Sequence, residues 1–244
     1  MNKISVIGIG PGAYEKLTLE AQKALEAAEV IVGYTLYIDL IRFFFPDKTY
    51  IGTGMRTEES RCKTAFEYAS RGHKVALVCS GDAGVYGLAG LMLGMEKHYP
   101  GCEVKIIPGI TAALAGAAIL GAPLIHDFAL ISLSDLLTPW EKIEKRLRLA
   151  AEADFVICIY NPSSKKRREH LRKACDILLR YREEETTCAA VRNITREGEA
   201  YHIMSLAKLK EFEADMFSTI YIGNSMTKRE GKRMITPRGY KSEE

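Results

Sequence analysis

One loop of this sequence holds the residue types that a ligand site needs. Residues 80–87 read SGDAGVYG and follow an apolar run at 74–79, so the loop offers one carboxylate, small residues and no lysine. Loops at the carboxyl ends of parallel strands are where open α/β sheets bind their ligands. A phosphate cradle needs a lysine and a serine or threonine after its glycines, whereas Asp82 would repel a phosphate and accept a hydroxyl donor or a cation. The loop therefore predicts a ligand that is not a nucleotide phosphate.

A second glycine-rich turn, GIGPG at residues 8–12, closes the first apolar run. It is not the dinucleotide fingerprint G-x-G-x-x-G, and Pro11 removes a backbone donor that a pyrophosphate would use. The acid that reads a ribose at the end of the second strand is also missing, because that strand ends at Gly33 and Tyr34. The turn either serves only to reverse the chain or faces a substrate, and both interpretations stay open.

A third turn, PGITAA at residues 108–113, follows the fourth apolar run. Pro108 and Gly109 make the turn, and Thr111 is placed to cap the next helix. A plain helix entry explains these residues. A ligand that hydrogen-bonds to Thr111 and to the free backbone groups of this entry explains them as well.

The second half of the chain carries a polar turn and a basic run. Residues 160–162 read YNP at the end of a strand, where Asn-Pro is a common turn and a Tyr or Asn could also reach a ligand. Residues 165–168 read KKRR and fall in the predicted first turn of a helix, where cations oppose the helix dipole. The run forms either a solvated face or a site that attracts a carboxylate.

His126 is the histidine that we single out as a general base, because the pKa of an imidazole suits proton transfer near neutral pH. It stands beside Asp127 and shortly before Ser132 and Asp135. A histidine next to an aspartate in a connection also serves as a structural hydrogen-bonding group. Both roles remain open for it.

The elements that must position these residues alternate along the first half of the chain. Apolar strand-like runs lie between helical patterns, and the hydrophobicity of the runs is continuous, which marks a mostly parallel sheet covered by helices. Thr18 and Glu20 give the first helix a capping signal. The expected strands are residues 4–9, 29–33, 74–79 and 104–107, and the expected helices are residues 18–28, 58–71 and 110–120.

The pattern changes after the turn residues Gly121, Ala122 and Pro123. Closely spaced strands then predict a mixed sheet with antiparallel pairs. We expect strands at 128–132, 155–160, 188–191, 200–204 and 217–223, helices at 139–151 and 165–181, and a short helix between the last two strands. The fold class is therefore α/β, with two α/β lobes at residues 1–120 and 121–244.

Composition excludes several classes of function. The net charge is +3, from 34 basic and 31 acidic residues, which is too balanced for a nucleic-acid protein. No apolar run is long enough for a membrane span, and Met1-Asn2-Lys3 leads straight into a strand, so we expect a cytoplasmic protein without a signal peptide. The six cysteines form no C-x-x-C pair, and we therefore expect no protein-bound metal and no disulfide framework.

The motifs resemble, as a set, those of the tetrapyrrole methylase superfamily, and more closely its C17-methyltransferases of corrin synthesis. The resemblance runs almost the whole length of the chain. It is carried by VIGIGPG at 6–12, GYTLY at 33–37, TGM at 53–55, SGDAGVY at 80–86, IPGITA at 107–112, HDF at 126–128, SLSDLLTPW at 132–140 and MITPRGY at 234–240.

The resemblance implies a class III tetrapyrrole methylase fold, with S-adenosylmethionine in the cleft between two α/β lobes. That co-substrate has a sulfonium cation and no phosphate, in keeping with a loop that has an acid and no lysine. Asp82 would accept from its ribose or its ammonium group. The implied cofactor-binding residues are Pro11, Gly81, Asp82, Val85, Thr111, Ala112, Asn161 and Asn193. The implied substrate-binding residues are Gly8, Gly10, Gly12 and Tyr34.

The implied reaction is methyl transfer to C17 of precorrin-3B or cobalt-precorrin-3, coupled to ring contraction in cobalamin biosynthesis. Ring contraction asks more of side chains than methyl transfer does, and our candidates for it are Tyr86, His126, Ser132 and Asp135. The chain departs from the superfamily at Ala13, where an acid is common. The resemblance also implies a homodimer. Diphthine synthase, a ribosomal RNA methyltransferase and a non-catalytic tetrapyrrole carrier are the alternatives.

Overall fold

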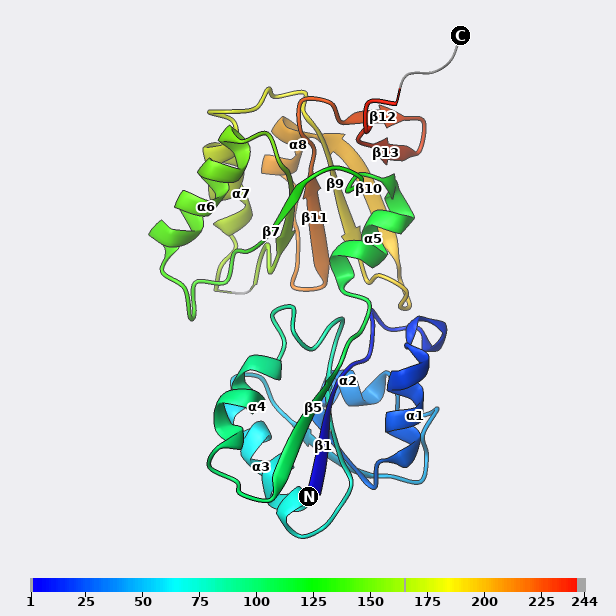
Figure 1. Ribbon diagram of the computed structural model, residues 1–244. Coiled ribbons are helices and arrows are strands. Elements are labelled where there is room, and N and C mark those ends of the chain that lie inside the picture. Colours follow the sequence, from blue (N-terminus) through cyan, green and yellow to red (C-terminus); the bar gives the residue numbers. More distant parts are fainter. Residues whose placement is uncertain (1, 165, 241–244) are drawn as a thin grey trace. The chain divides into compact units, whose positions relative to one another are not determined.

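The computed structural model describes residues 2–164 and 166–240, which fold into two compact units (Figure 1). The division falls between Ala112 and Ala113, whereas the turn residues at 121–123 had placed it after residue 120. Helix α5 (Ala112–Leu120) therefore lies almost wholly in the second unit. The reason is contacts with residues far along the chain: the hydroxyl of Tyr221 donates to the carbonyl of Ala113 (2.8 Å), and the hydroxyl of Tyr160 accepts from the N–H of Ala113 (2.7 Å).

The first unit is built on a five-stranded sheet in the order β3-β2-β4-β1-β5. Every pair in it is parallel, as the continuous hydrophobicity of the runs predicts. All five strands therefore end at the same edge, which we call the carboxyl edge. The strands are β1 (Asn2–Gly8), β2 (Val30–Tyr34), β3 (Thr49–Thr53), β4 (Val75–Cys79) and β5 (Cys102–Ile107).

Helices cover both faces of this sheet (Figure 1). Alternate strand residues point to opposite faces, so that Val6 and Leu77 pack with α3 and α4, whereas Ile7 and Val78 pack with α1 and α2. Thr18 caps α1 as expected, because its hydroxyl oxygen accepts from the N–H of Ala21 (3.1 Å). The helices are α1 (Leu19–Ala27), α2 (Thr35–Asp39), α3 (Glu58–Ser70), α4 (Ala89–Glu96) and the 3₁₀ turn η1 (Tyr14–Lys16).

The second unit contains the expected mixed sheet, in the order β10-β9-β11-β8-β7. Strands β7 and β8 are parallel and the other pairs are antiparallel. A further three-stranded sheet, β12-β13-β6, was not predicted, because its strands have only two or three residues. The strands are β6 (Gly121–Ala122), β7 (Phe128–Ser132), β8 (Val156–Tyr160), β9 (Thr187–Arg192), β10 (Ala200–Ser205), β11 (Ser218–Ile222), β12 (Lys228–Glu230) and β13 (Arg233–Ile235).

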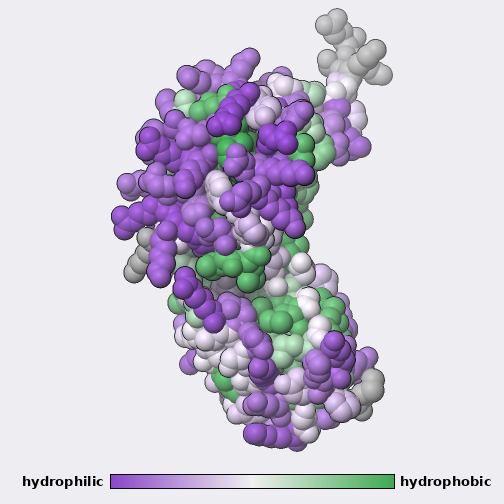
Figure 2. Space-filling model, turned by 90° about the vertical axis from the view of Figure 1, so that its left-hand side faces the viewer, coloured by the Kyte–Doolittle hydropathy of each residue, from purple (hydrophilic) through white to green (hydrophobic). Residues whose placement is uncertain are grey.

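Helices α6 (Trp140–Glu152) and α7 (His170–Leu178) pack on this sheet, and α8 (Leu206–Lys210) is the expected short helix. Helix α6 buries Ile143 and Leu147, and Figure 2 shows that the face carrying α6 and α7 is covered mainly by hydrophilic side chains. The longest helices of the described residues have 13 residues, and none of them is long and apolar enough to span a bilayer.

The long helix expected at residues 165–181 is wrong in its bounds. Helix α7 has only nine residues, and Lys165 lies outside the described residues. Arg167 precedes the helix, which begins at His170. The side chain of Arg167 donates to the hydroxyls of Ser164 (3.1 Å) and Ser134 (2.6 Å). The basic run therefore does not sit on the first turn of a helix.

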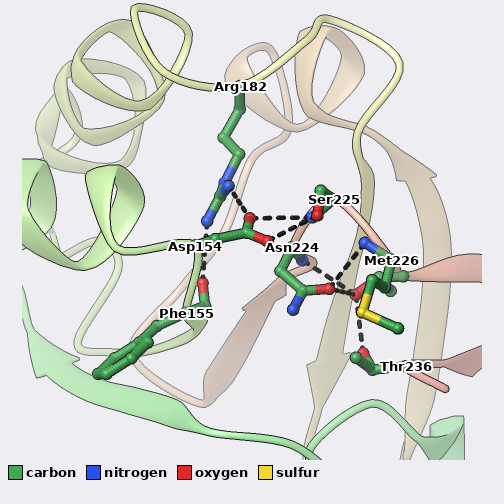
Figure 3. A network of polar contacts seen from close by, with 8 residues as sticks. Asp154, Phe155, Arg182, Asn224, Ser225, Met226 and Thr236 are labelled. Carbon is green, nitrogen blue, oxygen red and sulfur yellow. Dashed lines mark hydrogen bonds and ion pairs between the residues drawn. The ribbon is translucent and has the colours of Figure 1, made fainter. Parts of the chain in front are cut away.

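A polar network fastens the turns at the other end of β8 (Figure 3). Asp154 accepts from the guanidinium of Arg182, from the N–H of Ser225 (3.0 Å) and from its hydroxyl (2.6 Å). The side chain of Asn224 bonds to the N–H of Met226 (3.0 Å). Partial burial raises the pKa of Asp154, but the bonds from Ser225 and Arg182 outweigh it and hold the pKa below its usual value.

Replacing Asp154 by asparagine should flatten the acid side of the stability profile. A carboxyl whose pKa is lowered in the folded state stabilises the protein above its unfolded pKa of about 4, and this contribution is lost as the pH falls through the folded pKa. Asparagine also tolerates the left-handed backbone of this position, where φ is 58°. Urea unfolding from pH 7 down to about pH 3 should show a smaller loss of unfolding free energy for D154N than for the wild type. Parallel pH profiles would contradict this role.

Candidate functional site

The loops after β1 and β4 are joined at the carboxyl edge of the first unit. Gly10 and Gly81 exchange two backbone hydrogen bonds, of 3.0 and 2.7 Å. Both residues have left-handed backbones, with φ of 69° and 67°, which glycine adopts without steric cost. The two glycine-rich turns that the sequence singled out are therefore one structural unit.

The loop after β5 joins this unit through glycine contacts. A Cβ atom on Gly109 would lie 2.2 Å from the carbonyl oxygen of Gly81 and 2.5 Å from that of Gly8. A Cβ on Gly8 would lie 2.6 Å from the same oxygen of Gly81. We call Gly8, Gly81 and Gly109 the glycine junction. Its close backbone contacts leave no room for a side chain at Gly8 or Gly109.

The carboxylate of Asp82 fastens the same loops. Its Oδ1 accepts from the N–H groups of Gly84 (2.7 Å) and Val85 (3.1 Å), and its Oδ2 accepts from the N–H of Gly109 (2.8 Å). Three of the roughly four lone-pair sites of a carboxylate are thus used by backbone donors. Asp82 shapes the site before any ligand arrives, a role that the sequence alone did not suggest.

The other candidates of the first unit lie on the same edge. Tyr86 is half-exposed with φ of 55°, a conformation that is costly for a residue with a side chain and often marks a functional site. Gly81 lies at van der Waals distance from Thr111 and Ala112, since a Cβ on it would be 3.5 Å from the Cα of Thr111. Pro11 and Gly12 follow the Gly10 bridge in the chain, and Tyr34 is the last residue of β2.

In the second unit, Ser132 and Asn161 meet at the carboxyl ends of β7 and β8. The amide of Asn161 donates to the Ser132 hydroxyl (2.9 Å), which also accepts from the N–H of Ser134 (3.2 Å). Asn161 has a left-handed backbone, with φ of 53°, as does Asn193 after β9 with φ of 50°. The amide of Asn193 donates to the carbonyl of Glu197 (3.2 Å).

Asp135 has a histidine partner, His170, which was not among the candidate residues. Its Oδ2 lies 3.2 Å from Nε2 of His170, and its Oδ1 lies 3.7 Å from the Arg167 guanidinium. The Nδ1 atom of His170 is buried without a hydrogen-bond partner among residues 2–164 and 166–240. His126 instead precedes β7, at the opposite end of that strand from Ser132, and its Nδ1 accepts from the N–H of Asp127 (2.9 Å).

Sequence reasoning missed His170 and Arg167 because both fell inside a predicted amphipathic helix. Their polar character and their spacing of three residues fitted its solvated face. The usable signal was the run of polar residues at 163–168, which follows the end of β8 just as residues 132–135 end and follow β7. Loops after neighbouring parallel strands meet at one edge, so these two runs were placed to interact.

The cysteines near the first site do not supply a nucleophile. All six cysteines are free and buried. Burial raises the pKa of the Cys79 thiol to about 11 and that of Cys62 to about 12. Both thiols are therefore protonated at neutral pH and pack as small apolar groups.

Comparison with known proteins gives one consistent picture. Residues 3–210 match the family model described as Tetrapyrrole (Corrin/Porphyrin) Methylases. A probable cobalt-factor III C(17)-methyltransferase of Salmonella typhimurium is 50% identical over 97% of this chain and 99% of its own length. A cobalt-factor III methyltransferase of Priestia megaterium is 44% identical over 98% of this chain, although the chain spans only 45% of that protein.

Solved structures agree with the fold described above. The crystal structure of the methyltransferase CobJ has a TM-score of 0.89 and 38% sequence identity, over 97% of this chain and 100% of that one. A uroporphyrin-III C-methyltransferase from Thermus thermophilus, complexed with S-adenosyl homocysteine, has a TM-score of 0.71 and 24% identity, over 91% and 97% of the two chains. The expected α/β fold class is confirmed.

Proposed function

Because this chain belongs to the tetrapyrrole methylase family, we propose that it methylates C17 of cobalt-factor III, with coupled ring contraction, in corrin synthesis. The observation that carries the proposal is the similarity to the Salmonella typhimurium relative, which extends over both units. The names of these relatives favour a corrin precursor over the protein and RNA substrates that the fold also serves. They favour a cobalt-loaded over a metal-free macrocycle as well.

We propose that S-adenosylmethionine binds at the carboxyl edge of the first unit. The chemistry of the edge fits it: residues 8–13, 80–87 and 108–112 contain no lysine or arginine, and they meet at the glycine junction. When bound there, this co-substrate supplies an electrophilic methyl group. Pro11, Gly81, Val85, Thr111 and Ala112 would line it with backbone groups, and Asp82 would hold the loops in place. Asn161 and Asn193 are the proposed contacts from the second unit.

We propose that Gly8, Gly10, Gly12 and Tyr34 face the macrocycle. Methyl transfer requires an in-line approach of the carbon nucleophile to the sulfonium methyl group, with water excluded. A rigid set of backbone loops can hold that approach without acid–base help. The nucleophilic carbon forms a bond to the methyl group as the bond between that methyl group and sulfur breaks. The electron pair of the broken carbon–sulfur bond stays on sulfur.

For ring contraction we propose Asp135 and Ser132 as proton-transfer groups. His170 and Arg167 fix one oxygen of Asp135 each, and Asn161 fixes the hydroxyl of Ser132. Tyr86 remains a candidate on the strength of its exposure and its unusual backbone. His126 remains a candidate for proton transfer, but it would have to act without Ser132 and Asp135, because it lies away from both. We also propose that the protein is a homodimer, on the family resemblance alone, and that it is cytoplasmic.

The wild-type protein should transfer one methyl group from isotope-labelled S-adenosylmethionine to cobalt-factor III. Mass spectrometry of the macrocycle, with fragments that locate the label, is the measurement. A parallel incubation with the metal-free macrocycle is the matched control, and we expect it to be the poorer substrate. A macrocycle that gains no label from active, S-adenosylhomocysteine-binding protein would refute the proposal.

A further inference from the structure

Arg61 is a buried arginine with no acidic partner in the part of the chain that the structure describes. It stands in the first turn of α3, next to the carboxyl edge, and only 5% of its surface is exposed. Among residues 2–164 and 166–240, no carboxylate forms an ion pair with it; Glu59, two positions earlier, pairs with Lys63 instead (2.9 Å). Arginine is almost never buried unless it is paired, because removing a charge from water is costly.

Neutral groups hold the guanidinium in one orientation. Its Nε donates to the hydroxyl of Thr53 (2.6 Å) and its Nη2 donates to the carbonyl of Gly54 (2.8 Å), while Cζ lies 5.9 Å from the ring centre of Tyr34. These bonds use two of the five N–H donors of an arginine. Three N–H donors therefore remain on a positively charged group held in one orientation, and no carboxylate among the residues that the structure describes forms an ion pair with it.

The guanidinium of Arg61 lies at the same edge of the sheet as the candidate loops. Thr53 and Tyr34 are the last residues of β3 and β2, which lie beside β4 at one side of the sheet. Two strand spacings separate the ends of β3 and β4, or about 10 Å. A macrocycle whose reacting carbon lies at the loops after β4 and β1 could bring its edge to this side. Corrin precursors carry acetate and propionate groups around that edge.

We propose that Arg61 binds a carboxylate side chain of the tetrapyrrole substrate and so fixes which way the macrocycle lies. This assignment rests on the proposed function and names a substrate contact for it. A guanidinium fits a carboxylate because the two planar groups can form paired, charge-assisted hydrogen bonds. Tyr34, which the family resemblance placed at the substrate, lies against the same guanidinium. The amino-acid head of S-adenosylmethionine also carries a carboxylate, and the test separates the two sources.

The test compares R61Q and R61K with R71Q, which removes an exposed arginine from the far end of α3. Absorbance titration measures the Kd of cobalt-factor III, and calorimetry measures that of S-adenosylhomocysteine. R61Q should weaken cobalt-factor III binding by about 10- to 100-fold, as loss of a charge-assisted hydrogen bond predicts. Its affinity for S-adenosylhomocysteine should stay within about twofold of the wild type. R61K keeps the charge without the planar fork and should lie between, whereas R71Q should match the wild type.

The outcomes separate this inference from the proposed function. If the wild type methylates cobalt-factor III and R61Q binds this substrate as tightly as the wild type does, the assignment of Arg61 is wrong but the proposed function stands. If R61Q loses affinity for S-adenosylhomocysteine but keeps its affinity for cobalt-factor III, Arg61 binds the carboxylate of the methyl donor. This outcome also overturns the assignment of Arg61 to the tetrapyrrole. If R61Q fails to fold, R61K decides, and unchanged cobalt-factor III binding by R61K refutes the contact. Wild type that does not bind cobalt-factor III at all overturns both proposals.

Discussion

Replacing Asp82 by alanine is expected to weaken S-adenosylhomocysteine binding by about a hundredfold, which corresponds to about 3 kcal/mol. The carboxylate accepts from the N–H groups of Gly84, Val85 and Gly109, so its loss frees three backbone donors in two loops. Hydrogen bonds to a charged group contribute about 1.5–3 kcal/mol each, and part of this is recovered when water reaches the freed donors. Binding would then have to order loops that the wild type already holds in place.

Asparagine at position 82 is the matched variant. It keeps an acceptor for Gly84 and Val85, but its amide group presents a donor, not an acceptor, to the N–H of Gly109. D82N should therefore bind S-adenosylhomocysteine with an affinity between those of D82A and the wild type. Faster hydrogen exchange at the Gly109 amide should accompany the loss in both variants. Affinity of D82A within threefold of the wild type, with unchanged exchange, would show that the carboxylate does not organise the loops.

Much of the fold was predictable because its signals are local. Continuous apolar runs identified the strands of both main sheets except β3, and the hydroxyl of Thr18 starts α1 as its position suggested. Strand β3 was missed because none of its residues is fully buried, so that it lacks a continuous apolar run. The β12-β13-β6 sheet was missed for a different reason: strands of two or three residues have too short a pattern to recognise.

The bounds of the units and of α7 depended on contacts between distant residues. Turn residues at 121–123 do end a helix, but Tyr221, about a hundred residues later, ties the start of that helix to the second unit. The basic run before α7 looked helical by composition, yet Arg167 turns back to Ser134 across the neighbouring strand end. Neither contact could be recognised from the residues next to it in the sequence.

In the candidate site, too, local features were predictable and contacts between distant residues were not. The sequence placed its candidate loops correctly at the carboxyl edge, because the position of a loop after a strand is a local property. The partners of the side chains could not be predicted from the sequence: Asp82 bonds to backbone donors, and Asp135 lies beside His170, 35 residues later in the chain. Arg61 stood in a correctly predicted helix, but what distinguishes it from a solvated arginine is its burial without an ion pair to any described acid.

Replacing Gly109 by alanine should abolish measurable S-adenosylhomocysteine binding and also destabilise the protein. The new Cβ would lie 2.2 Å from the carbonyl oxygen of Gly81 and 2.5 Å from that of Gly8, whereas ordinary contacts are 3.4–4 Å. All the atoms concerned are backbone, so no side-chain rotation relieves the overlap and the loops must separate. Overpacking of this kind costs about 1–3 kcal/mol of folding stability. Calorimetric titration and thermal unfolding measure the two effects.

Gly90 provides the matched control, because it receives the same added methyl group on the helix that follows the Asp82 loop. A Cβ there meets nothing within 4 Å, and alanine is favoured over glycine within a helix. G90A should therefore bind S-adenosylhomocysteine like the wild type and unfold at an equal or higher temperature. Full binding by G109A would mean that the loops can separate without harm to the site.

Gly109 also donates its N–H to Asp82, so the two substitutions disturb one junction. Residues in direct contact show non-additive effects, and the D82A/G109A pair should lose less stability than the sum of the single variants. Once alanine at position 109 has pushed the loops apart, the Asp82 carboxylate no longer has that donor to hold. Strict additivity would mean that the carboxylate and the glycine contact act on the loops independently.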